Sequence, residues 1–439
     1  MAKNFGIEIE FMLAGKPPSA ILHPRLSGDD RWPDSESHHD IYETYSASLD
    51  TLKVCEALTS CNLPVACRIN PGELQDPLTK TPEGDLVEDI NGTYVTRTGN
   101  LEDPEHPLRK AEIGHVFRVW NKEVAKENFP GQQYHLGQQH QFRFWFVDGE
   151  HIPNRSNERP PTDHSWNGME ISLPVISDQK EIDAGLPTLK GAFEALRKSL
   201  LINLTSDCGL HIHGSPSSGS IDLPLAKKVI AVIRLLEEPF IQKICHPVRR
   251  NLPSVEPIGS MSILGKKSKG DETETAPSVG GFIQIIQGFR SKLQNRSPDE
   301  PDAFRFMEFL FAAETLDSLR KDLKSGTSGT STPHRCGIAI SLLGTVEFRY
   351  PQSSFDPEWP AFWVKLMQKI FQICAEPDAA FSASFERLYE LGTRQQALGW
   401  ESWLEELGLS SQYKEVCARH MGDANSPRKN EILPKVSGV

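Results

Sequence analysis

The sequence predicts an α+β fold, in which strands carrying polar side chains on one face form a sheet and helices pack beside it. Two patterns support this class. Polar and apolar residues alternate in several short stretches, and longer stretches place apolar residues at helical spacing. The alternating stretches predict strands at 6–11, 141–147, 169–173, 209–214 and 338–350.

Helices are expected where apolar residues recur every three or four positions. The predicted ranges are 37–61, 179–201, 223–246 and most of the chain from 351 to 407. Asp222 is the expected N-cap of the third helix, and Pro224 lies in its first turn. We expect a single domain over 1–420, with surface insertions near 70–112 and 265–281, another flexible connection at 325–332, and a polar, disordered tail over 421–439.

The composition excludes several classes of partner. The 439 residues include 47 basic and 59 acidic side chains, a formal net charge of −12, so attraction to nucleic acid or to an anionic membrane is not expected. The N-terminal residues lack the pattern of a secretory signal, and no run approaches the roughly 18 apolar residues of a membrane span. We therefore expect a cytoplasmic protein whose eight cysteines, none in a CxxC pair, are reduced.

Four of the predicted strands carry unusual polar faces, because side chains at i and i+2 of a strand share a face. A solvated strand face normally holds Thr, Lys, Ser or Gln, whereas these faces hold the residue types that bind metals and phosphates. A strand that packs on the core by its other face would give the same alternation, so each strand alone also has a purely structural explanation. The polar residues are Glu8, Glu10, Glu170, His211, His213, Glu347 and Arg349.

Two of these patterns have specific alternatives. A His-x-His pair on a strand, as at His211 and His213, also occurs in zinc or iron sites of hydrolases and oxygenases. Arg249 and Arg250 follow the third predicted helix, where positive charge is favourable at a helix C-terminus without any ligand. If the strands share a cleft, one of these arginines could instead hold a phosphate or a carboxylate.

Six motifs follow one another along most of residues 5–375. They are GIEIEF at 6–11, FWFVDGE at 144–150, NGMEISLPVI at 167–176, DCGLHIHG at 207–214, HPVRRN at 246–251 and GTVEFRYPQSSFDPEW at 344–359. Their order resembles that of the amidoligase family, which belongs with the carboxylate–amine ligases of the glutamine synthetase and glutamate–cysteine ligase fold. The sequence departs from the family pattern at Asp148-Gly149-Glu150 and at Ser172-Leu173-Pro174.

The resemblance implies a curved antiparallel sheet with helices packed on one side, and an enzyme that uses ATP and Mg²⁺. Such an enzyme joins a small-molecule or peptide carboxylate to an amine through an acyl phosphate. It implies magnesium ligands at Glu8, Glu10, Glu170 and Glu347, and contacts to the cofactor from His211, His213 and Asp148. Arg349 and one of Arg249 or Arg250 would steady the phosphoryl group or the acyl substrate.

Two other functions are compatible with the residues. One is a metal-dependent hydrolase or oxygenase built on the paired histidines. The other is a non-catalytic relative that binds a nucleotide or a metabolite.

Overall fold

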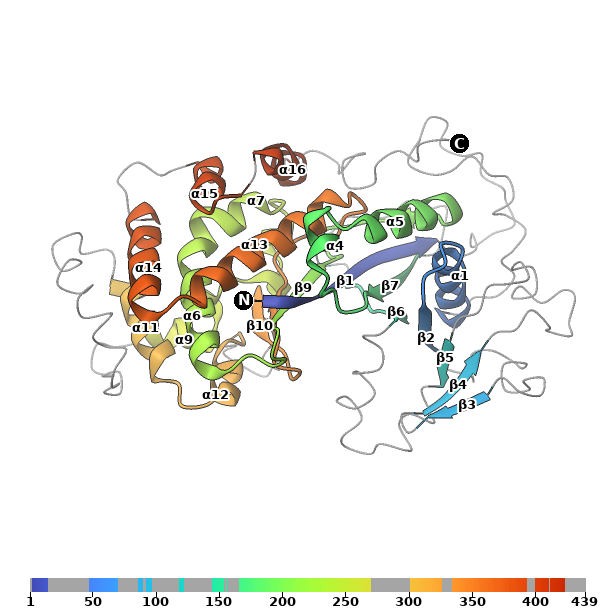
Figure 1. Ribbon diagram of the computed structural model, residues 1–439, viewed down its shortest axis with the longest axis horizontal. Coiled ribbons are helices and arrows are strands. Elements are labelled where there is room, and N and C mark those ends of the chain that lie inside the picture. The colour runs from blue at the N-terminus through green and yellow to red at the C-terminus, as the bar shows by residue number, and fades with distance from the viewer. Residues whose placement is uncertain are drawn as a thin grey trace, which may run out of the picture. The chain divides into compact units, whose positions relative to one another are not determined.

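A mixed β-sheet forms the centre of the computed structural model, and Figure 1 shows its strands and helices. The structure describes residues 2–14, 47–69, 86–89, 92–96, 118–121, 144–153, 155, 166–269, 301–325, 334–392, 399–409 and 411–422. The described strands are β1 (Ala2–Ala14), β2 (Val65–Ile69), β3 (Leu86–Asp89), β4 (Gly92–Thr96), β5 (Arg118–Asn121), β6 (Trp145–Gly149), β7 (Trp166–Ser172), β8 (Ile202–Asn203), β9 (Leu210–Pro216), β10 (Ile338–Ile340) and β11 (Val346–Phe348).

The strand order is β10-β11-β9-β1-β7-β6-β2-β5-β4-β3, and β8 also pairs with β1. The pairs β1–β7, β6–β7, β9–β11 and β10–β11 are antiparallel. β2, however, runs parallel to both β5 and β6, so the expectation of a purely antiparallel sheet is wrong at this strand. Parallel neighbours need long connections, and long segments separate β2 from β5 and β5 from β6.

Most of the described helices lie in the second half of the chain (Figure 1). They are α1 (Ala47–Thr59), α4 (Gln179–Asp183), α5 (Pro187–Ser199), α6 (Leu223–Leu236), α7 (Gln242–Ile244), α8 (Ile258–Met261), α9 (Ile263–Lys269), α11 (Pro301–Ala312), α12 (Leu316–Asp322), α13 (Glu358–Cys374), α14 (Asp378–Gly392), α15 (Trp400–Glu406) and α16 (Gln412–Met421). A π-helical segment, Glu237–Ile241, joins α6 to α7, and two 3₁₀ turns follow at Arg249–Asn251 and Pro253–Val255.

Several predicted elements are confirmed and others are corrected. Asp222 caps α6 by accepting a hydrogen bond from the backbone N–H of Leu225 at 2.8 Å, and a proline follows in the first turn. The single helix expected over 179–201 is wrong, because Gly185 and Leu186 adopt φ of +78° and +60° between α4 and α5. A left-handed conformation ends a right-handed helix, and Pro187 then begins the next one.

Two segments that were expected to be loops contain regular structure. Residues 265–269 belong to α9, whereas 270–281, 326–332 and the tail from 423 lie outside the described residues. The predicted insertion at 70–112 contributes the antiparallel pair β3 and β4. The overlooked signal is the run Thr93-Tyr94-Val95-Thr96, because β-branched and aromatic residues favour a strand.

The chain divides into two units, which are treated separately below. The first, called here the histidine unit, comprises Met1–Phe5, His211–Pro351 and Ala361–Pro427. The second, called here the carboxylate unit, comprises Gly6–Leu210, Gln352–Pro360 and Arg428–Val439. The expected single domain over 1–420 stays a prediction.

The core of the carboxylate unit lies under the apolar face of β1. Ile7, Ile9 and Phe11 are each at most 1% exposed, as the alternation predicts, and the Phe11 ring meets Phe355 edge to face. Fully burying each such side chain contributes about 1.5–3 kcal/mol. Helix α1 packs on β2 and β6, so the sheet is covered there.

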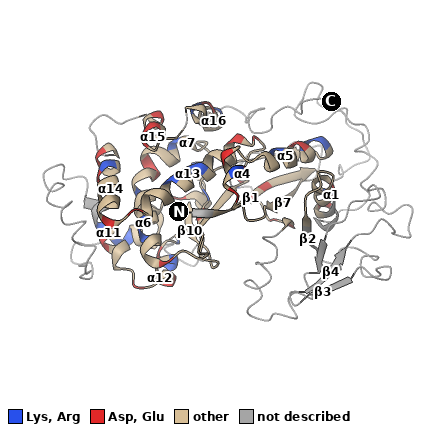
Figure 2. Cartoon of the chain, viewed as in Figure 1, with Lys and Arg blue, Asp and Glu red and all other residues tan. Residues whose placement is uncertain are grey.

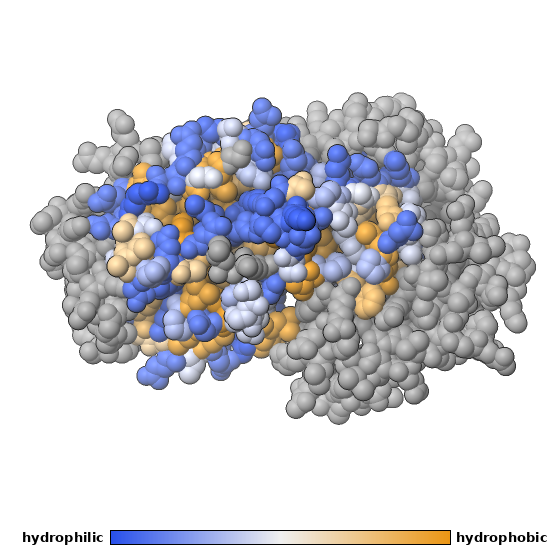
Figure 3. Space-filling view, viewed as in Figure 1, coloured by the Kyte–Doolittle hydropathy of each residue, from blue (hydrophilic) through white to orange (hydrophobic). Residues whose placement is uncertain are grey.

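The core of the histidine unit centres on α6, whose Val229, Ile230, Ile233 and Leu236 are completely buried. Helices α11 and α14 pack against α6 (Figure 1). Lys, Arg, Asp and Glu are interspersed along the helices rather than segregated by sign (Figure 2). The face drawn in Figure 3 also mixes hydrophilic and hydrophobic residues. Within the described residues, no helix combines the length and apolar character needed to cross a membrane.

Candidate functional site

Three carboxylates lie directly opposite one another on three neighbouring strands of the carboxylate unit. Glu170 on β7 is the register partner of Glu10 on β1 and of Asp148 on β6. Directly opposed residues in antiparallel strands place their Cβ atoms about 4.5–5.5 Å apart, and like charges there are destabilising. Glu8 shares a face of β1 with Glu10, because the two residues are separated by two positions. We call Glu8, Glu10, Asp148 and Glu170 the carboxylate row.

The carboxylate row changes the acid–base behaviour of its central member. Burial, followed by the negative charges of Glu8 and Glu10, raises the pKa of Glu170 well above its usual range. The Ser172 hydroxyl donates a hydrogen bond to Glu170 Oε1 at 3.3 Å, and the carboxylates opposite Glu170 on both sides repel its negative charge. The row therefore favours a bound cation, which would relieve the repulsion.

A fifth carboxylate, Glu150, belongs to the same region and was not singled out from the sequence. Burial and the negative charge of Glu10 raise the pKa of Glu150, so Glu150 interacts electrostatically with the carboxylate row. Its backbone is held by Gly168, whose carbonyl accepts a hydrogen bond from the Glu150 N–H at 2.9 Å. A Cβ at Gly168 would lie 2.2 Å from the Glu150 carbonyl oxygen, so this close approach requires glycine. The i, i+2 spacing of Asp148 and Glu150 is the signal that could have found it.

Glu10 is anchored by the backbone that precedes β9. The Gly209 N–H donates to Glu10 Oε2 at 2.6 Å, and the Glu10 N–H donates to the Gly209 carbonyl at 3.0 Å. This reciprocal pair fixes the carboxylate without introducing a positive charge. A bound cation would add the positive charge that these two hydrogen bonds do not supply.

In the histidine unit, a fully buried carboxylate has the opposite environment. Glu347 on β11 is 0% exposed and contacts the guanidinium of Arg349. Nη1 of Arg335 donates to both of its oxygens, at 3.2 and 3.0 Å. Burial alone favours the neutral acid, but the charges of Arg349, His213 and Arg335 outweigh it and lower the pKa of Glu347 to about 2.

His211 and His213 project from β9 beside Glu347. His213 is the register partner of Glu347, and its Nδ1 lies 2.9 Å from the Thr345 hydroxyl. Nδ1 of His211 lies 3.9 Å from Glu347 Oε1. A hydrogen bond that fixes one ring nitrogen orients the imidazole, as is typical of histidines that bind metals.

The two arginines at 249 and 250 occupy different environments. Arg249 is 1% exposed, and its Nη2 donates to the backbone carbonyl of Arg349 at 3.1 Å. The Arg349 N–H donates to the Gly337 carbonyl at 2.8 Å, so the Arg349 backbone is held on both sides. Arg250 is exposed, and the described residues include no side-chain partner for it. The structure thus places the Arg249 side chain against the backbone of Arg349, whereas Arg250 is exposed to solvent.

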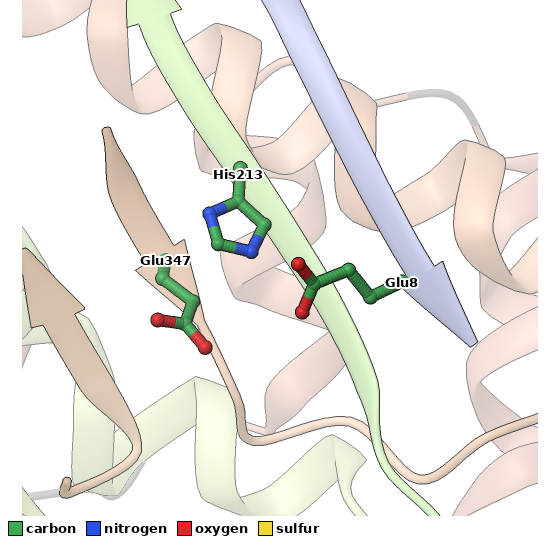
Figure 4. A group of neighbouring side chains, drawn as sticks. All are labelled: Glu8, His213 and Glu347. Atoms are coloured by element: carbon green, nitrogen blue, oxygen red, sulfur yellow. The ribbon is translucent and has the colours of Figure 1, made fainter. Parts of the chain in front are cut away.

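Figure 4 shows His213 and Glu347 on the neighbouring strands β9 and β11 of the histidine unit. Each of these two side chains offers one ligand atom, and the two atoms lie within 4.8 Å of one another. In the carboxylate unit, one carboxylate oxygen of Glu8 and one of Glu170 meet the same limit. Carboxylate oxygens and imidazole nitrogens are suitable donors for a divalent cation, and an all-oxygen row is the donor type that Mg²⁺ prefers.

No family model, curated protein or solved structure matches the chain. The resemblance of the motif order to the amidoligase family therefore stays a prediction. The structure shows a mixed α/β protein with antiparallel strand pairs and helices. The motif order implies a more specific fold than this description.

Proposed function

We propose that the protein is an ATP- and Mg²⁺-dependent ligase that joins a carboxylate to an amine through an acyl phosphate. The observation that carries this proposal is the alignment of Glu10, Glu170 and Asp148 across three adjacent strands. Opposed carboxylates are unfavourable in a folded protein unless a cation accompanies them in the functional state. A site that concentrates oxygen ligands and repulsion in one row supports binding of divalent cations with phosphates.

Magnesium fits the carboxylate row, because hard oxygen donors suit Mg²⁺ better than they suit softer metals. Glu8, Glu10 and Glu170 would hold it, with Asp148 and Glu150 adding negative charge nearby. Bound magnesium would neutralise the nucleotide phosphates, which phosphoryl transfer requires.

The chain's own cations supply the rest of the proposed chemistry. An unactivated carboxylate does not condense with an amine in water, whereas its acyl phosphate does, and ATP can supply that phosphoryl group. Phosphoryl transfer needs alignment and charge stabilisation more than covalent help. Arg349, held by its backbone and by Glu347, is suited to fix one oxyanion in place.

A second candidate function has one specific observation in its favour. The contact between His213 Nδ1 and the Thr345 hydroxyl orients the ring in the manner of a metal-ligating histidine. A hydrolase or oxygenase that uses zinc or iron at His211 and His213 would exploit the same feature. Metal analysis of the purified protein separates the two functions, because the second requires tightly held zinc or iron and no nucleotide.

Calorimetric titration with ATP, with and without Mg²⁺, tests the ligase directly. We expect binding that depends on Mg²⁺, followed by ADP release only when pooled carboxylates and amines are both added. Glu170→Gln should abolish both signals because it removes the central oxygen ligand of the row.

Glu405→Gln is the matched control for this substitution. Glu405 is largely exposed and pairs with Lys414 at 2.6 Å, so its removal should leave ATP binding and ADP release unchanged. If the wild-type protein binds no nucleotide at any Mg²⁺ concentration, the ligase proposal is wrong.

A further inference from the structure

Arg335 has an unusual combination of exposure and anchoring. Its side chain is 52% exposed, yet its Nη1 donates to both oxygens of a carboxylate that is 0% exposed. The residue lies just before β10 and also forms an isolated bridge with Lys324. A half-exposed guanidinium is thus held in one place by a buried partner.

Glu347 does not require Arg335 for neutralisation. Arg349 already contacts Glu347 Oε1, its side chain is only 16% exposed, and its backbone is fixed by Gly337 and Arg249. One well-buried cation balances one buried carboxylate, whereas an ion pair formed by a half-exposed side chain adds little stability. The group formed by Glu347, Arg335 and Arg349 therefore carries two positive charges against one negative charge.

Arg335 also has N–H donors that do not bond to Glu347. A guanidinium carries five N–H groups in a planar fork. Of the N–H groups of Arg335, only those on Nη1 donate a hydrogen bond to a side chain of the described residues. The remaining donors of the fork match the geometry of a phosphate or carboxylate, both of which accept two parallel hydrogen bonds.

We propose that Arg335 binds an oxyanion group of a substrate, either a nucleotide phosphate or the carboxylate to be activated, while Glu347 holds its guanidinium in position. This inference rests on the proposed ligase function, because it names the residue that contacts the anionic substrate of that reaction. An oxyanion bound to Arg335 would also balance the excess positive charge beside Glu347.

Calorimetry on the full chain with three probes tests this role. The probes are the Mg²⁺ complex of tripolyphosphate, succinate, and Mn²⁺ alone. In Arg335→Gln, we expect affinity for one anionic probe to fall about tenfold or more, because a hydrogen-bonded charge pair is lost. Arg335→Lys should recover only part of that affinity, since lysine keeps the charge and loses the fork.

The two anionic probes distinguish the sources of the oxyanion. A loss confined to tripolyphosphate assigns Arg335 to the nucleotide, and a loss confined to succinate assigns it to the acyl substrate. Arg387→Gln is the matched control, because Arg387 is also largely exposed and pairs with a single carboxylate, Glu406. That variant should bind all probes as the wild type does.

Unchanged affinity of Arg335→Gln for both anions would overturn the inference, as would a wild-type protein that binds neither. The Mn²⁺ titration separates this failure from failure of the proposed function. Binding of Mn²⁺ without any anion would leave the metal site intact and reject the role of Arg335. Arg335-dependent anion binding without binding of Mn²⁺ would reject the metal-dependent ligase and retain the anion site.

Discussion

Glu170 is partly exposed and Glu347 is fully buried; both are strand glutamates, and their environments shift their pKa values in opposite directions. Glu170 lies between two other carboxylates, and burial with their charges raises its pKa. Glu347 contacts two guanidinium groups, which lower its pKa to about 2 despite complete burial. The comparison shows that burial and nearby negative charge both raise the pKa of Glu170, whereas nearby positive charges outweigh burial at Glu347.

The same comparison gives the two regions different chemical preferences. The carboxylate row concentrates negative charge and so favours metal cations. The two guanidinium groups beside Glu347 favour anions.

The largest expected effect on stability is that of Glu347→Gln. The substitution leaves Arg349 and Arg335 facing a neutral amide, and breaking a buried ion pair by removing one partner costs roughly 3–5 kcal/mol. Urea denaturation at neutral pH measures this loss. An unchanged midpoint would show that the arginines do not depend on this carboxylate and would remove the basis of the comparison.

Glu170→Gln should have the opposite sign and a smaller size. Removing one of three opposed carboxylates relieves repulsion, so the metal-free variant should be about 0.5–1 kcal/mol more stable than the wild type at neutral pH. Thermal denaturation in the presence of a chelator checks this increase. A decrease would mean that Glu170 is a structural residue rather than one kept for its ligand.

The pH dependence of stability follows the same division. Because the folded-state pKa of Glu170 is raised above 4.5, its ionisation opposes folding, and stability declines as pH rises from about 4.5 toward that folded-state value. For Glu347 the folded-state pKa is depressed, so its contribution is present above 4.5 and is lost as pH falls toward about 2. Denaturation midpoints across pH 3–8 should show Glu170→Gln removing the first trend and Glu347→Gln the second. Parallel profiles for wild type and both variants would contradict the assignment.

The sequence predicts those features of the fold and the site that depend on neighbouring positions, and it does not predict those that depend on distant ones. The i, i+2 spacing of Glu8 and Glu10 predicts a shared face, and the burial of Ile7, Ile9 and Phe11 confirms the other face of β1. The opposition of Glu10, Glu170 and Asp148 depends on register between strands about 20 to 160 positions apart, which no local pattern encodes.

The residues that sequence reasoning missed also owe their positions to strand pairing. Arg335 reaches Glu347 because β10 and β11 form a hairpin, and Arg335 lies outside any alternating pattern of its own. The π-helical segment after α6 contains Pro239, which has no N–H for the α-helical hydrogen-bond pattern, so an interruption of the helix was predictable there but its π form was not. The family resemblance predicts the same ligand role for Glu170 and Glu347, and it does not distinguish a carboxylate between other carboxylates from one beside two arginines.

The smallest expected effect is that of Arg250→Gln, which sharpens the comparison by contrast with its neighbour. Arg250 is exposed, so its substitution should change the free energy of unfolding by less than about 0.5 kcal/mol and leave ATP binding unaltered. Arg249→Gln should instead destabilise the protein and weaken ATP binding, because it removes the donor that holds the Arg349 carbonyl. Urea denaturation and calorimetry on the two variants give both quantities. Equal effects of the two substitutions would mean that Arg349 is positioned by its side-chain contact with Glu347 alone.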